Sequence, residues 1–98
     1  MELTIQNNTD KSRFETTVEG HLAFVEYHLN KDRIAFIHTE VPEALEGKGI
    51  ATALAKYVLQ YARDQHLKVV PFCPFISGYI RKHIEEYRDM LAPGYEDI

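Results

Sequence analysis

The first half of the chain alternates apolar and polar positions in three successive runs, at residues 13–19, 22–29 and 34–41. Each run is rich in β-branched and aromatic residues, and a period of two with such residues is typical of half-buried β-strands. The short links between the runs, at 19–20 and 30–32, favour an antiparallel meander. Residues 3–5 form a weaker candidate, either a first strand or the start of the next one.

The second half changes its period at Ile50, where apolar residues begin to recur at steps of three and four. Such a stripe predicts an amphipathic helix, here from about Gly49 to about Gln65. The apolar run 67–72 predicts a short buried strand, and a second helix is expected after it, capped by Ser77 and ended at Pro93. The order β-β-β-β-α-β-α predicts an α+β or mixed α/β fold with helices packed on a sheet.

The composition narrows the class of protein. The 98 residues are 45% hydrophobic and 27% charged, without repeat or linker, which predicts a single folded domain over 1–98. The net charge of −4 argues against a nucleic-acid partner. Cys73 is the single cysteine, which excludes an internal disulfide and a zinc site of four cysteines. No signal peptide or membrane-spanning run is visible, so we expect a cytoplasmic protein without a membrane partner.

A turn with two glycines, Glu46-Gly47-Lys48-Gly49, lies between a predicted strand and a predicted helix. Glycines let such a turn direct its backbone N–H groups at one point, and with the helix N-terminus they form an anion site suited to a pyrophosphate. The same residues also fit a plain strand-to-helix turn. The pattern is neither a P-loop nor a dinucleotide fingerprint, because Ser or Thr does not follow Lys48 and a third glycine is missing.

Two prolines, Pro71 and Pro74, flank Cys73 at the end of the last predicted strand. Proline donates no hydrogen bond, so this strand is expected to part from its neighbour and to leave Cys73 beside a gap. The alternative is that Cys73 is simply a small buried apolar residue.

Regular alternation places His38 on the same face as Ile34 and Phe36, at the end of that face. An imidazole there is a candidate general base, because its ordinary pKa lies near 6.5. The alternative is a hydrogen-bonded histidine at the rim of the core. The five histidines form no helical metal-ligand pair, so no metal site is predicted.

The succession of strand, glycine turn and amphipathic helix resembles the acetyl-CoA-binding core of the GNAT acetyltransferase superfamily. Gly47 and Gly49 match the two small residues of its signature, whereas Ala44 stands where the signature has Gln or Arg. The segments 38–42, 71–75 and 79–83 further resemble the small, minimal GNAT-like acetyltransferases, and this resemblance covers nearly the whole chain.

The resemblance implies that acetyl-CoA is the cosubstrate, that its pyrophosphate lies on the amides of the glycine turn, and that its pantetheine arm lies between two parallel strands that splay apart. The strands are those ending near Val41 and near Cys73. The residues expected to contact acetyl-CoA are Val41, Leu45, Glu46, Gly47, Lys48, Gly49, Ile50, Ala51, Pro74, Phe75 and Lys82.

Two chemistries fit this resemblance. In direct transfer, His38 takes a proton from an amine that attacks the thioester, and a backbone N–H near Val41 polarises its carbonyl. In the covalent route, Cys73 accepts the acetyl group first. Tyr79 is a candidate for protonating the leaving thiolate, or else a core aromatic residue.

The acceptor is expected to be an unidentified amine, on a small molecule or a protein, and the chain to be a monomer or a weak dimer. A chain of this length has no residues for the extra helices and strands that shape the acceptor site in longer members. The alternative function is therefore a non-catalytic module that binds CoA or acyl-CoA, or another protein.

Overall fold

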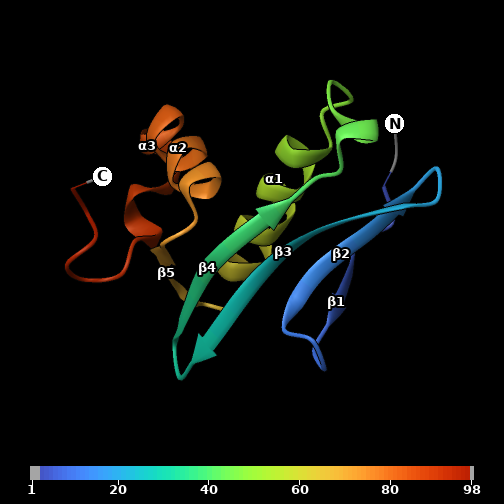
Figure 1. The fold of residues 1–98 in the computed structure, drawn as a ribbon. Coiled ribbons are helices and arrows are strands. Elements are labelled where there is room, and N and C mark those ends of the chain that lie inside the picture. Colours follow the sequence, from blue (N-terminus) through green and yellow to red (C-terminus); the bar gives the residue numbers. More distant parts are fainter. Residues whose placement is uncertain (1–2, 98) are drawn as a thin grey trace.

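The computed structural model describes residues 3–97 and contains one five-stranded sheet with helices on one face (Figure 1). The strands lie side by side in chain order, and they are β1 (Gln6–Asn8), β2 (Arg13–Val18), β3 (His21–Asn30), β4 (Arg33–Glu40) and β5 (Lys68–Pro71). The first four pair antiparallel, and β4 pairs with β5 in parallel. The helices are α1 (Ile50–Asp64), which joins β4 to β5, then α2 (Pro74–Lys82) and α3 (Ile84–Tyr87). The predicted mixed α+β fold is confirmed.

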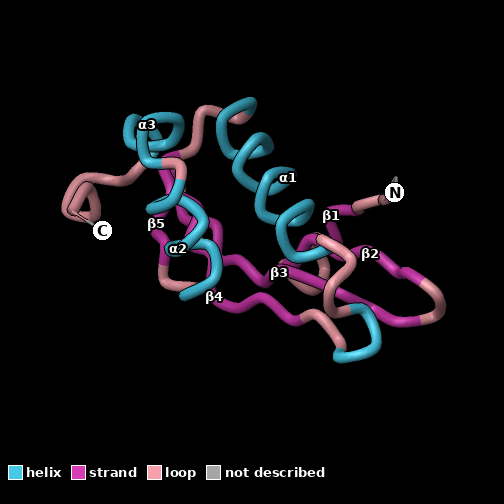
Figure 2. The backbone as a smooth tube through the Cα atoms, turned by 90° about the horizontal axis from the view of Figure 1, so that it is seen from above, coloured by secondary structure: helices cyan, strands magenta, loops and turns pink. Residues whose placement is uncertain are grey.

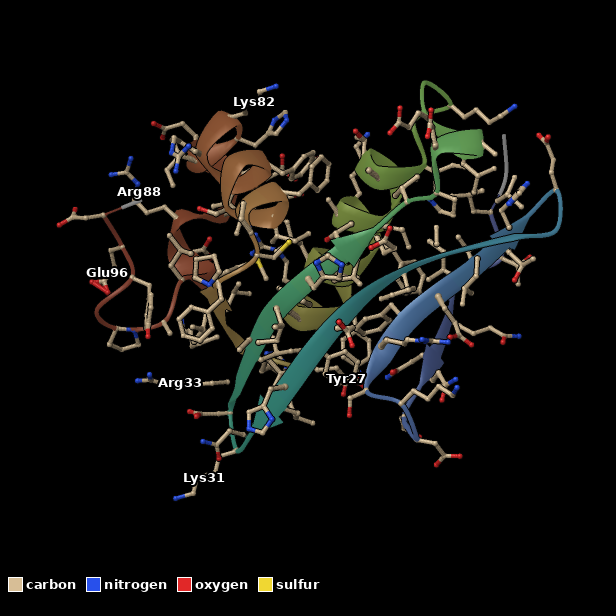
Figure 3. The ribbon with its side chains drawn as sticks, viewed as in Figure 1. Tyr27, Lys31, Arg33, Lys82, Arg88 and Glu96 are labelled. Atoms are coloured by element: carbon tan, nitrogen blue, oxygen red, sulfur yellow. The ribbon has the colours of Figure 1, made fainter. Side chains whose placement is uncertain are left out.

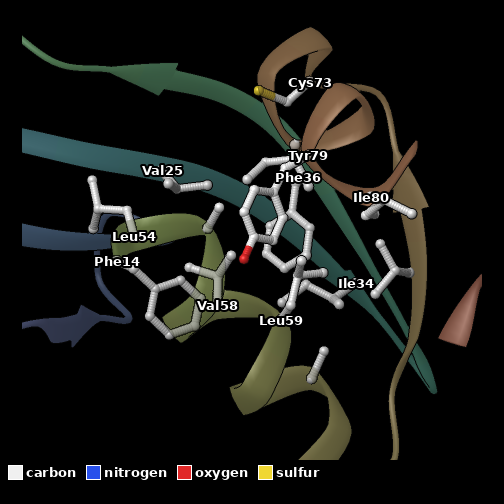
Figure 4. Packing of buried hydrophobic residues seen from close by; sticks show 14 of the residues in the cluster. Phe14, Val25, Ile34, Phe36, Leu54, Val58, Leu59, Cys73, Tyr79 and Ile80 are labelled. Carbon is white, nitrogen blue, oxygen red and sulfur yellow. The ribbon is translucent and has the colours of Figure 1, made fainter. Parts of the chain in front are cut away.

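The core lies between the sheet and α1, which runs along one side of β3 and β4 (Figure 2). The apolar stripe of α1 is buried as predicted, and it packs on fully buried residues of the strands such as Phe14, Val25 and Phe36 (Figure 4). Each large apolar side chain buried in this way stabilises the fold by about 1.5–3 kcal/mol. Helix α1 ends where His66 adopts a φ of 58° and the Leu67 N–H donates to the Ala62 carbonyl at 2.8 Å.

Two expected element boundaries are wrong. The first strand is β1 and not residues 3–5, and Leu3 and Ile5 instead pack against the core. The second helix begins at Pro74, with Cys73 as its N-cap, and not at Ser77. Proline suits the first helical position, because its fixed φ fits the helix and its missing N–H has no partner there anyway. The helix also breaks at His83, with a φ of −123°, which separates α2 from α3.

A one-residue bulge in β4 decides which side chains reach which face. Glu26 pairs with His38, but the next residue, Tyr27, pairs with Phe36, so Ile37 is an extra residue on β4. A bulge of this kind reverses the alternation of side chains beyond it. Phe36 remains in the core, whereas His38 lies on the outer face, the face of the sheet opposite α1. The expectation that His38 shares the face of Phe36 is therefore wrong.

Candidate acetyl-CoA site

The turn after β4 is built on two glycines in the left-handed region. Gly47 has a φ of 81° and Gly49, the N-cap of α1, a φ of 76°. Apart from the adjoining residues of the chain, no atom of residues 3–97 lies within 4 Å of the position that a Cβ would take at either glycine, so backbone conformation and not crowding requires glycine here. In the described part of the chain, no side chain caps the N-terminus of α1. Its first N–H groups therefore have no intrahelical or side-chain acceptor, which suits them to an anion.

A hollow of about 270 Å³ lies over this turn. It brings together every expected cofactor-binding residue of the segment 41–51 except Lys48. Its lining is formed by Val41, Leu45, Glu46, Gly47, Gly49, Ile50, Ala51 and Thr52. The Lys48 ammonium group instead lies 3.1 Å from the Glu19 carboxylate in the turn between β2 and β3. Apart from the Glu46 carboxylate, the hollow is walled by main chain and by short or apolar side chains.

A second hollow, of about 430 Å³, lies between α1 and α2. It shares Thr52 with the first hollow, and the expected Pro74, Phe75 and Lys82 line it with Tyr79. Figure 3 shows Lys82 extending outward from the end of α2. Thr52, Gly78 and Arg81 complete the lining, and Thr52 and Gly78 were not predicted from the sequence. Thr52 could have been predicted from the sequence, because it lies on the polar face of α1 shortly after the glycine turn.

Beside these hollows, β4 and β5 stop pairing. Their last pair is Phe36 with Pro71, and the Cys73 N–H then donates to the Phe36 carbonyl at 2.7 Å. The chain next enters α2, while β4 continues (Figure 1). We call this point the strand fork. Beyond it, residues 37–40 have no strand partner on the β5 side within residues 3–97, as the prolines predicted, so β4 has an unpaired backbone edge here.

Cys73 lies at the strand fork, on the helix side of the sheet. It is only 2% exposed, and its sulfur lies 3.2 Å from the Thr39 hydroxyl. Thr39 faces this side because it pairs with the buried Val25, beyond the bulge. Thr39 was not predicted as a site residue, since a regular strand would turn it away from the core.

His38 lies on the other side of β4. Its side chain is 52% exposed, and its Nε2 atom lies 3.0 Å from a carboxylate oxygen of Glu40. The ring also meets Phe24 edge-on, with 6.2 Å between centroids. Successive residues of a strand point to opposite faces, and Cys73 contacts Thr39. The structure therefore does not bring His38 and Cys73 together on one face of the sheet.

Tyr79 is a largely buried residue of α2. Its ring packs against His83 and Tyr87, with centroid distances of 4.6 Å and 5.9 Å. In Figure 4 its ring extends toward α1, and its hydroxyl lies apart from the Cys73 sulfur. Burial, with the neighbouring Tyr79 and Glu86, raises the pKa of Tyr87 well above its ordinary value. Tyr79 also borders a third hollow, of about 690 Å³ between α1 and α3, so it touches two cavities.

Two further observations concern metals and membranes. Within residues 3–97, no three or more His, Cys, Asp or Glu side chains are grouped so that they could hold a metal ion. In the same part of the chain, every helix is too short or too polar to cross a membrane.

Comparison with known proteins identifies the family. The model of the GCN5-related N-acetyltransferase family matches residues 13–90. Protein NATD1 from Gallus gallus is 30% identical over 95 residues, which cover 91% of this chain and 86% of that protein. Protein NATD1 from Xenopus tropicalis is 25% identical over 95 residues, covering 93% and 87%. An NMR solution structure of a GCN5-like protein from Staphylococcus aureus superimposes with a TM-score of 0.68 and 26% identity, over 92% of this chain and 88% of that one. The chain therefore belongs to the GCN5-related N-acetyltransferase family.

Proposed function

We propose that this protein transfers the acetyl group of acetyl-CoA to a primary amine. One observation carries the proposal: a glycine turn with uncapped helix amides lies directly beside the fork of two parallel strands. Such a turn suits a pyrophosphate, and an unpaired strand edge suits an amide-containing arm that pairs with it. The two features are joined through Val41, which follows β4 and borders the hollow over the turn.

Acetyl-CoA would be held by three groups of residues along its length. The amides around Gly47 and Gly49 would hold the pyrophosphate, and the free edge of β4 would hold the pantetheine arm. The adenosine end would occupy the second hollow, where Phe75 offers a half-exposed ring and Lys82 a positive charge. This order directs the thioester toward the strand fork, because the arm must run along β4 away from the turn.

Direct transfer is the route that the geometry favours. The Glu40 carboxylate, 3.0 Å from Nε2, orients the His38 imidazole, and orientation of a base by a third group is the usual arrangement in proton-transfer catalysis. An amine approaching from the outer face would give a proton to His38 and attack the thioester carbonyl at the fork. A backbone N–H of the unpaired β4 edge, toward Val41, would polarise that carbonyl.

The Cys73 route is the second candidate, and a separate contact favours it. In this route the Cys73 sulfur attacks the thioester, the CoA thiolate leaves with the thiol proton, and an amine then displaces the acetyl group from Cys73. The Thr39 hydroxyl is in hydrogen-bonding contact with the sulfur, and Cys73 caps the nine-residue helix α2. In the direct route, Tyr79 is the candidate donor of a proton to the leaving thiolate, provided that its ring turns toward the fork. A non-catalytic acyl-CoA-binding or interaction module remains the alternative function.

Calorimetry with acetyl-CoA, followed by mass spectrometry with isotope-labelled acetyl-CoA, tests these proposals. Binding together with labelled product from a panel of primary amines supports an acetyltransferase. Binding without product or protein acetylation supports the non-catalytic module, whereas an absence of binding at millimolar acetyl-CoA overturns the proposal. A labelled acetyl group on Cys73 that an amine removes selects the covalent route.

A further inference from the structure

The two arms of the strand fork each carry a large apolar side chain that is exposed to solvent. Ile37, directly after Phe36 on β4, is 44% exposed, and Phe72, directly after Pro71 on β5, is 58% exposed. Single exposed apolar residues are common on protein surfaces. Ile37 and Phe72 directly follow Phe36 and Pro71, the last residues that pair between β4 and β5. They therefore lie on either side of the opening where the two strands diverge.

The apolar surface continues from Phe72 onto Tyr95. The two rings meet edge-on with 5.9 Å between centroids, and Tyr95 packs over the buried Ala35 and Val70. Ala35 precedes Phe36 on β4 and pairs with Val70 on β5, so Tyr95 covers the outer face of the sheet. Phe72 and Tyr95 therefore form an apolar patch beside the fork, and Ile37 follows the last strand pair on the other arm, at the side from which an acceptor would approach His38. Contiguous exposed apolar surface often marks a binding site.

Carboxylates lie on the same outer face of the sheet as this apolar patch. Glu40 is in contact with His38, and Glu26 is the cross-strand partner of His38 on the same outer face. The neighbouring cation Arg13 is already bonded to Glu15 at 2.6 Å, and its guanidinium lies over the Phe24 ring. Within residues 3–97, Glu26 forms no ion pair. Two carboxylates beside an apolar patch are complementary to a molecule with an ammonium group and an apolar body.

We propose that the acceptor is a primary amine on an apolar, preferably aromatic, carbon skeleton, and that Ile37 and Phe72 hold this skeleton. The proposal rests on the proposed acetyl transfer and names its substrate class. The ammonium group would approach between the Glu26 and Glu40 carboxylates, and His38 would take its proton. A hydroxylated or sugar-like amine would lose hydration against Ile37 and Phe72 without gaining a hydrogen-bonding partner there.

The test uses stable adducts in which the sulfur of CoA is joined through an acetyl linker to the nitrogen of an amine. One adduct carries phenethylamine and the other ethanolamine, and calorimetry compares their affinities with that of CoA. We expect the phenethyl adduct to bind about tenfold more tightly than the hydroxyethyl adduct. Phe72→Ser and Ile37→Ser should each reduce this preference. Leu29→Ser, at the opposite end of β3, is the control, since Leu29 is 50% exposed and should not affect the preference.

The outcomes separate the two proposals. Equal affinity of the two adducts, or a preference unchanged in both Phe72→Ser and Ile37→Ser, overturns the apolar acceptor while CoA binding stands. If the unaltered protein binds neither CoA nor the adducts, both the proposed acetyl transfer and the proposed acceptor class are overturned. Thermal melts of all variants check that the fold is kept, and CoA affinity should be the same in Phe72→Ser and Leu29→Ser as in the unaltered protein.

Discussion

Gly49→Val separates the contribution of the glycine turn to folding from its contribution to binding acetyl-CoA. Gly49 has a φ of 76°, and no atom lies within 4 Å of the place where a Cβ would stand. The substitution therefore destabilises the fold through backbone strain alone and disturbs no packing. The left-handed region costs a residue with a side chain about 1–2 kcal/mol, and a β-branched residue more. In a domain of this size the melting temperature falls by about 4–8 °C for each kcal/mol.

The effect on binding should exceed this strain. The valine side chain would stand at the edge of the hollow of about 270 Å³ over the turn, where the amides of α1 have no side-chain cap. We expect acetyl-CoA affinity, measured by calorimetry well below the melting temperature, to fall by at least about tenfold. Gly94→Val is the matched control, because Gly94 has a φ of 95° and equally open surroundings in the C-terminal segment. It should lose stability but keep its affinity. If Gly49→Val bound acetyl-CoA as tightly as Gly94→Val, the turn would have no part in the site.

Three further substitutions test the chemistry and the electrostatics. His38→Gln should lower kcat/KM for an amine about 10²–10⁴-fold, the usual contribution of a general base, with unchanged acetyl-CoA affinity in calorimetry; undiminished turnover would exclude His38 as the base. Cys73→Ser keeps a hydroxyl for the Thr39 contact but removes the thiol. Amine acetylation should persist in steady-state assays if transfer is direct, and its complete loss would favour the covalent route instead. The hydrogen bond from the Arg13 guanidinium lowers the pKa of Glu15 in the folded chain. The ionised Glu15 carboxylate therefore stabilises the fold at a pH above the pKa that Glu15 has in the unfolded chain. This stabilisation is lost as the pH falls through the lower pKa that Glu15 has in the folded chain. The difference in melting temperature between the unaltered protein and Glu15→Gln should therefore shrink from about pH 7 to about pH 3, and a constant difference would contradict this assignment.

Local patterns in the sequence predicted most of the fold, because each depends on neighbouring residues only. The alternation of apolar residues located β2, β3 and β4, and the helical stripe located α1. The start of α2 was misplaced because Ser77 matched the preference for a capping side chain, whereas Pro74 begins this helix without a side-chain cap. The glycine turn was predictable for the same local reason, since its conformation is encoded in Gly47 and Gly49 themselves.

The faces of β4 were not predictable in this way. A bulge depends on how two strands pair, and nothing in the residues 34–40 marks Ile37 as the extra one. Regular alternation would have put His38 on the core side with Cys73, in reach of each other. The bulge exchanges the neighbours His38 and Thr39, so that the thiol meets a hydroxyl and the imidazole meets the Glu40 carboxylate.

This exchange assigns the two candidate chemistries to opposite sides of one strand. A thioester at the strand fork, where β4 loses its partner, would be open to the outer face and to the helix side alike. On the outer face the thioester would meet His38 and the neighbouring carboxylates of Glu40 and Glu26, which suit removal of a proton from an amine. From the helix side it would meet the nearly buried Cys73, which an amine in solution does not reach directly. Because a diffusing acceptor arrives from solvent and His38 is half-exposed, the direct route requires no opening of the core, whereas delivery of an acetyl group from Cys73 requires the amine to pass through the fork.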